Sequence, residues 1–242
     1  MRISSNSPTH AAPLLLSCLL AVAVAVLLIK PETRGYILSR LSRKSVDSRL
    51  SAIGAAKPQI VEAAGQIKGS LSILVFKNER LVELHATGWK APRIYEMTGF
   101  SGRLGPKLRE GDGQIPEGVY GIEYLNPNSA FHLSLKVSYP NAFDREMAGK
   151  DGRTNLGGDI MIHGGRATVG CIPIGDDAIE EVFFFAAKAG TENTTVVIAP
   201  YDMRKCRRPD LERSPLSWYG SLCDAIAAAF AGNSPPTTQT SD

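Results

Sequence analysis

Residues 157–174 read GGDIMIHGGRATVGCIPI, and this stretch decides the fold around it. Two short apolar runs, 160–162 and 171–174, have the length and the β-branched content of buried strands. His163 ends the first run, and Cys171 begins the second. Because the glycine-rich loop between the runs can fold back, the sequence predicts that these two side chains meet.

A cysteine beside a histidine is the arrangement that nucleophilic acyl transfer needs. An adjacent imidazole can hold a thiolate–imidazolium pair and so raise the nucleophilicity of the thiol. Gly164 and Gly170 leave the loop backbone uncovered, so amides near Gly170 and Cys171 are candidate donors to a developing oxyanion. The alternative is a buried cysteine and a core histidine in a glycine-rich turn. The glycine pattern favours the reactive site.

The stretch resembles the YkuD-type L,D-transpeptidase family, and within it the YafK-like branch. That family carries a His-Gly pair, a spacer and then Ser/Thr-x-Gly-Cys, which here are His163-Gly164 and Thr168-Val169-Gly170-Cys171. Further segments that look like this branch lie upstream: 105–107, 111–120, 138–141 and Asp144. The resemblance covers about residues 70–200.

The resemblance implies a mainly β fold with α: a compact YkuD-like sheet sandwich or barrel with a packed helix. It implies that Cys171 is the nucleophile, that His163 is the general base and acid, and that peptide stems of peptidoglycan are the substrate. The His-to-Cys spacer is short, Val169 stands where many members have a second histidine, and Pro173 where many have an arginine. The short spacer and Val169 fit the YafK-like branch, in which some members hydrolyse rather than transfer.

Three functions stay open at this point. With an amine as acceptor, a thioester on Cys171 gives an L,D-transpeptidase, and with water it gives an L,D-amidase or peptidase. The third is an inactive membrane-tethered wall-binding module, an idea motivated by the departures at Val169 and Pro173.

Other side chains are candidates for supporting roles. Thr168 can orient the loop or the histidine. His132 and Arg166 are candidates for substrate contact, because His132 lies opposite the apolar face of the alternating stretch 131–137. A solvated position is the alternative for His132. A zinc site at Cys171 and the histidines is the chemical rival, but no Cys-x-x-Cys or His-x-His pattern supports a metal, and no cofactor motif is present.

The composition is that of a globular protein. The 242 residues include 21% charged side chains and carry a net charge of only +3, so nucleic-acid binding has little support. Of four cysteines, Cys206 and Cys223 can pair in an oxidising compartment, which would leave Cys171 as a thiol. Two unrelated thiols are the alternative.

Residues 13–29 are almost wholly apolar and predict an uncleaved transmembrane signal anchor. A cleaved signal peptide and a core helix are the alternatives. Positive charges after this segment (Lys30, Arg34, Arg40, Arg43 and Lys44) outnumber Arg2 before it, which would keep the C-terminal part in the cytoplasm. The resemblance implies the opposite orientation, with the domain on the periplasmic side of a bacterial inner membrane. We follow the resemblance.

The expected organisation follows from these segments. It comprises an N-terminal tail (1–12), the anchor (13–29), a helical spacer broken at Gly54 and Pro58 (30–69), the catalytic domain (70–200), a C-terminal helical extension (201–231) and a disordered tail (232–242). The sequence predicts strands at 71–76, 81–86, 119–125, 131–137 and 194–199, helices at 176–188 and 216–230, and loops at 87–118 and 142–158.

Overall fold

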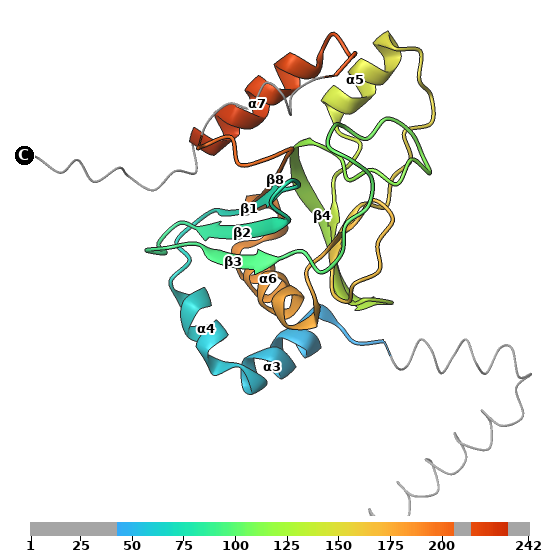
Figure 1. Cartoon of the computed structure of the whole chain (residues 1–242). Helices are drawn as coiled ribbons and strands as arrows, with labels where there is room; N and C mark the ends of the chain where they lie inside the picture. The colour runs from blue at the N-terminus through green and yellow to red at the C-terminus, as the bar shows by residue number, and fades with distance from the viewer. Residues whose placement is uncertain (1–42, 206–213, 232–242) are drawn as a thin grey trace, which may run out of the picture. The chain divides into compact units, whose positions relative to one another are not determined.

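The computed structural model describes residues 43–205 and 214–231 (Figure 1). The predicted tails, the predicted anchor, the start of the spacer and Cys206 lie outside these residues. Within the described ranges, no helix is both long and apolar enough to cross a membrane. The chain divides into two units, Met1–Lys44 and Ser45–Asp242, and every element below belongs to the second.

A mixed sheet runs through this second unit in the order β3-β2-β1-β8-β4-β5-β6-β7. The strands are β1 Leu71–Phe76, β2 Leu81–Ala86, β3 Arg93–Glu96, β4 Gly118–Ser129, β5 His132–Val137, β6 Met161–His163, β7 Ile172–Pro173 and β8 Thr194–Ala199. Strands β1 and β8 are parallel, as are β6 and β7, and the other neighbours are antiparallel. This half-barrel sheet with packed helices confirms the expectation of a mainly β fold with α.

Helices cover both faces of the sheet (Figure 1). They are α3 Val46–Ala56, α4 Pro58–Gly65, α5 Ala142–Lys150, α6 Asp176–Ala189 and α7 Tyr219–Ala231. Leu71, Ile73 and Val75 of β1 belong to the core shared with α6, whereas Leu74 and Phe76 belong to the core shared with α7. Both faces of β1 are therefore buried, which explains why five of its six residues are apolar.

Strand β4 joins the two halves of the sheet. Its first residues, 118–121, pair with β8, and residues 122–129 pair with β5. The sequence predicted that this strand ends at residue 125, and this prediction is wrong because β4 continues through Asn126 and Pro127 to Ser129. The β4–β5 register shifts between Asn126 and Ser129, and a proline is tolerated where the ladder is interrupted.

Several predicted boundaries hold. Strands β1, β2 and β8 have the predicted bounds. Helix α6 begins at the predicted residue and ends one residue later than predicted, at Ala189 before Gly190. The expected break of the spacer occurs at Pro58, which begins α4, whereas Gly54 stays inside α3.

Two elements were predicted as loops. Helix α5 begins at a capping box, in which Asn141 and Asp144 bind each other's backbone amides, and only Met147 and Ala148 in it are buried. With so little apolar periodicity, its sequence does not stand out as helical. Strand β3 pairs only with β2 at the sheet edge and has no fully buried residue.

Candidate active site

The strands β5, β6 and β7 form the floor of the candidate site. In their register, His163 lies opposite Ser134 on one side and Pro173 on the other, and Lys136 lies opposite Met161. Since side chains alternate along a strand, Lys136 and His163 point to the same face. Cys171 immediately precedes β7, and the register places it level with Met161. The predicted histidine thus lies on β6 and the predicted cysteine directly before the neighbouring strand β7, two register positions away.

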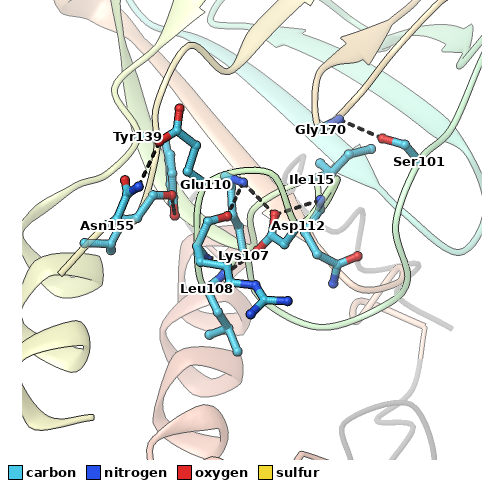
Figure 2. A network of polar contacts seen from close by, with 12 residues as sticks. Ser101, Lys107, Leu108, Glu110, Asp112, Ile115, Tyr139, Asn155 and Gly170 are labelled. Atoms are coloured by element: carbon cyan, nitrogen blue, oxygen red, sulfur yellow. Dashed lines mark hydrogen bonds and ion pairs between the residues drawn. The ribbon is translucent and has the colours of Figure 1, made fainter. Parts of the chain in front are cut away.

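The turn before Cys171 is held by two hydroxyl groups. The Thr168 hydroxyl donates to the Cys171 carbonyl oxygen at 2.7 Å and accepts from the Cys171 amide at 3.0 Å. The Gly170 amide donates to Ser101 Oγ at 2.7 Å, as Figure 2 shows. Gly170 itself has φ +89°, a conformation that glycine adopts without strain. Both amides predicted as oxyanion donors therefore carry a hydroxyl partner here.

The Cys171 thiol is partly exposed and contacts the chain just before β6. It donates to the Asp159 carbonyl oxygen, with Sγ at 3.4 Å. Burial raises the pKa of Cys171, although the Met161 amide and the nearby positive charge of Lys136 act in the opposite direction. At neutral pH the group is therefore a thiol in this structure.

His163 is buried, and its tautomer is fixed by the backbone. Nδ1 lies 2.6 Å from the carbonyl oxygen of Gly164. Because a carbonyl only accepts hydrogen bonds, Nδ1 carries the proton and Nε2 is left as the acceptor. Burial lowers the pKa of His163, so the imidazole is neutral at pH 7. The expected thiolate–imidazolium pair is therefore not the resting state.

The Phe131 ring covers the imidazole of His163, with ring centroids 4.6 Å apart. The same residue fixes the backbone after His163, because the Phe131 carbonyl accepts from the Gly164 amide at 3.1 Å. A Cβ on Gly164 would stand 2.7 Å from that carbonyl and 2.5 Å from Asp176 Oδ1. The His-Gly pair is thus explained by close packing at Gly164.

The two predicted substrate contacts are not brought next to Cys171. His132 has φ +70° at the start of β5, which takes its side chain out of the strand alternation, and Nε2 lies 2.8 Å from Glu180 Oε1 on α6. Arg166 is exposed on the loop, and its guanidinium makes no ion pair with the residues that the structure describes. Substrate contact by either residue stays a prediction.

The predicted disulfide also stays a prediction. Cys223 is fully buried in α7, and Cys206 lies outside the described residues. No three side chains of His, Cys, Asp or Glu cluster as a metal site within residues 43–205 and 214–231.

The loop between β3 and β4 forms one wall of the site. Asp112 accepts from the Leu108, Arg109 and Gln114 amides and from Lys107 Nζ, as Figure 2 shows in part. Against the effect of partial burial, these bonds lower the pKa of Asp112, so its carboxylate stays ionised. This carboxylate organises the loop that carries Ser101.

Sequence reasoning missed three residues of the site: Ser101, Phe131 and Lys136. Ser101 lies far away in sequence, and nothing near it indicates a contact with Gly170. Phe131 looked like a core residue of its strand. Lys136 had a usable signal, since it lies on the polar face of the alternating stretch 131–137.

The fold and the site together define a class of protein. It is a β-rich domain in which a histidine of fixed tautomer and a partly exposed cysteine lie at neighbouring strands. The model of the YkuD family, described as the L,D-transpeptidase catalytic domain, matches residues 70–198. The chain belongs to this family.

Among curated relatives, the Escherichia coli (strain K12) protein YafK is 32% identical over 163 residues, and the match covers 64% of each chain. Among solved structures, the helical cell shape determining protein Pgp2 from Campylobacter jejuni is similar, with 18% identity, 78% coverage of both chains and a TM-score of 0.43. Bd1075 of Bdellovibrio bacteriovorus matches with 20% identity and a TM-score of 0.39, covering 55% of this chain and 49% of that one.

Proposed function

We propose that the protein is a cysteine acyltransferase that acts on peptide stems of peptidoglycan, with a thioester intermediate on Cys171. The observation that carries this proposal is the tautomer of His163. Its Nδ1 is held by the Gly164 carbonyl, so the free base, Nε2, is available on the strand beside the cysteine. Family membership supplies the substrate class.

The proposed reaction consists of two acyl transfers, first to Cys171 and then to the acceptor. As Cys171 Sγ attacks the stem carbonyl, its proton passes to His163 Nε2, because the resting pair is neutral. His163 then returns this proton to the leaving amine, and the thioester remains. An acceptor amine then attacks the thioester and gives up a proton to His163 Nε2. The C–S bond breaks as the new amide forms, and His163 returns the proton to Cys171 Sγ.

The amides of Gly170 and Cys171 stay the proposed oxyanion donors. Each donates to a hydroxyl in the resting structure, so Ser101 and Thr168 have to share or release these amides when the carbonyl binds. Removal of one oxyanion donor typically costs about 3 kcal/mol in the transition state.

The second candidate function is a wall-binding module without catalysis. The observation in its favour is the pKa of Cys171, which burial raises rather than lowers. A binding module has no need of a reactive thiol, whereas a transferase needs the thiol to ionise during attack.

The test uses the purified full-length chain with muropeptides, and mass spectrometry follows the products. A new cross-link that is absent with Cys171→Ala and with His163→Ala supports the transferase. Cys223→Ala is the matched control, because it removes a buried thiol from α7 and leaves the site intact. A cleaved product with water added identifies an L,D-amidase or peptidase instead. Binding to wall material with no difference between wild type and Cys171→Ala supports the binding module.

The anchor at 13–29 and a periplasmic position of the domain belong to the same proposal. A peptidoglycan enzyme requires this orientation, while the positive charges after the anchor oppose it. Labelling of intact cells with a membrane-impermeant thiol reagent at a cysteine placed on the exposed face of α5 tests it. Labelling only after lysis would overturn it.

A further inference from the structure

Lys136 is a buried lysine on the floor of the site. It lies on β5, and only 9% of its side chain is exposed. Its Nζ is not among the fully buried polar atoms that lack a hydrogen-bond partner in the described residues, so the ammonium group keeps some access to water while its stem is buried. An ammonium group with so little hydration gains from close partners. The contacts of Lys136 therefore show whether its ammonium group serves only to stabilise the fold or is available to bind a ligand.

The partner of Lys136 is weak. Its Nζ lies 3.4 Å from Asp159 Oδ1, and the Asp159 side chain is 92% exposed. Within the described part of the chain, this is the one ion pair of Lys136, and no hydrogen bond of its Nζ is found there. An ion pair with so exposed a carboxylate contributes little and is easily exchanged.

The other buried lysines show how a structural ammonium is bound. Lys107 Nζ donates to Asp112 Oδ1 at 2.6 Å and to the Arg109 carbonyl at 2.8 Å. Lys77 Nζ makes three such bonds between 2.7 and 2.8 Å. Of the three N–H donors of an ammonium group, Lys77 uses three and Lys107 uses two, so Lys136 retains donor capacity that these lysines have spent on the protein.

Lys136 also stands beside the nucleophile. It lies opposite Met161, shares the face of His163, and its charge acts on the Cys171 thiol. Asp159, its partner, is the residue whose carbonyl accepts from the thiol. A peptide whose carbonyl lies over Cys171 therefore has its neighbouring groups within reach of this ammonium.

We propose that Lys136 forms a carboxylate subsite that binds a free carboxylate of the peptide substrate near the scissile bond. The carboxylate replaces Asp159 as the counter-ion and accepts hydrogen bonds from Nζ. Carboxylates are the anionic groups of a peptide stem, and charge-assisted bonds of this kind are stronger than neutral ones. The identity of the natural ligand rests on the proposed function, whereas the positive charge of Lys136 at this position does not.

The first experiment does not depend on catalysis. Full-length protein is alkylated with iodoacetate, which carries a carboxylate, or with neutral iodoacetamide, and mass spectrometry of peptides measures the rate at Cys171. Relative to wild type, Lys136→Met lowers the iodoacetate-to-iodoacetamide rate ratio by about tenfold, and Lys136→Arg keeps most of it. Lys150→Met is the matched control, since it removes the same charge from an exposed position on α5.

A second variant keeps the test valid if Lys136→Met folds poorly. Asp159→Asn removes the competing carboxylate at an exposed position with φ +53°, which asparagine tolerates. This variant raises the iodoacetate-to-iodoacetamide ratio. An equal fall of both rates in Lys136→Met would mean that Lys136 stabilises the thiolate only, and unchanged rates would mean a structural cation. Either result would contradict the proposal that Lys136 forms a carboxylate subsite.

The second experiment uses stem peptides in which each carboxylate in turn is converted to a primary amide. One such amidation lowers kcat/KM for wild type by about tenfold and has no further effect in Lys136→Met. If wild type processes every amidated peptide as well as the parent, the subsite is wrong and the acyltransferase stands. If wild type processes none of the peptides, including the parent, the proposed function fails, and the alkylation ratios alone decide on the subsite.

Discussion

At the residue scale, the neutral state of His163 has a measurable consequence. Burial lowers the pKa of His163 below the ordinary value of 6.5. The imidazole therefore stays an active base at a lower pH than an exposed histidine would, and kcat/KM falls on the acid side only as His163 becomes protonated. Titration of the histidine side chains by NMR, with His163→Ala to assign the signal, should give a midpoint below 6.5. A midpoint at or above this value contradicts the prediction.

Phe131 provides the second prediction at this scale. The residue is 43% exposed, and its ring covers the imidazole of His163, so it excludes water from one face of the base. Phe131→Ala should raise the pKa of His163 toward the ordinary value, because rehydration favours the charged form. Phe131→Leu, which still covers the ring, should shift the NMR midpoint less. If Phe131→Ala leaves the midpoint in place, the burial of His163 comes from other groups.

The sequence predicts the reactive residues His163 and Cys171 better than it predicts the residues that position them. His163 and Cys171 are visible because they flank one loop, so short-range spacing alone puts them on adjoining strands. Ser101 is 69 positions away from Gly170, and only the path of the intervening loop brings the two together. His132 was expected on the Lys136 face by alternation, and the positive φ at the start of β5 turned it to α6 instead.

At the element scale, the loop between β3 and β4 supports the nucleophile turn through Ser101. Ser101→Ala removes the acceptor of the Gly170 amide and should lower kcat/KM by about two- to tenfold, which is the usual net value of one hydrogen bond. Ser101→Thr, which keeps a hydroxyl, is the control. A rise in activity with Ser101→Ala would mean that release of the Gly170 amide, and not the position of the loop, limits catalysis.

Elements follow the sequence where burial is periodic and depart from it where other contacts take over. Strands β1, β2 and β8 and helix α6 have apolar patterns long enough to fix their bounds. An aspartate at the start of a helix is typical of a cap, but Gly175 holds the N-cap position of α6, and the Asp176 carboxylate accepts from the Gly165 amide at 2.7 Å. The acid therefore ties the helix to the loop after His163, a long-range role that the local pattern does not indicate.

At the scale of the whole folded unit, α7 is joined to the site wall by a buried polar network. Lys77 and Glu117 form a 2.8 Å ion pair whose side chains are both fully buried. Glu117 also accepts from the Gly105 amide at 2.7 Å and, through Oε2, from the Tyr219 hydroxyl at 2.6 Å. The network thus connects the end of β1, the loop that carries Ser101 and the first turn of α7. It makes the C-terminal helix a part of the same cooperative structure.

Removal of a single oxygen tests this connection. Tyr219→Phe leaves Glu117 Oε2 without its donor in a dry environment, so the free energy of unfolding should fall by about 1–3 kcal/mol. Urea unfolding measures the loss, and Tyr124→Phe, which removes a hydroxyl from an exposed ring, should change nothing. Adding Glu117→Gln to Tyr219→Phe should cost less than the sum of the two single changes, because the two residues share one network. If the two free-energy changes are strictly additive, or if Tyr219→Phe is as stable as wild type, then α7 stabilises the fold only through the packing of its apolar face.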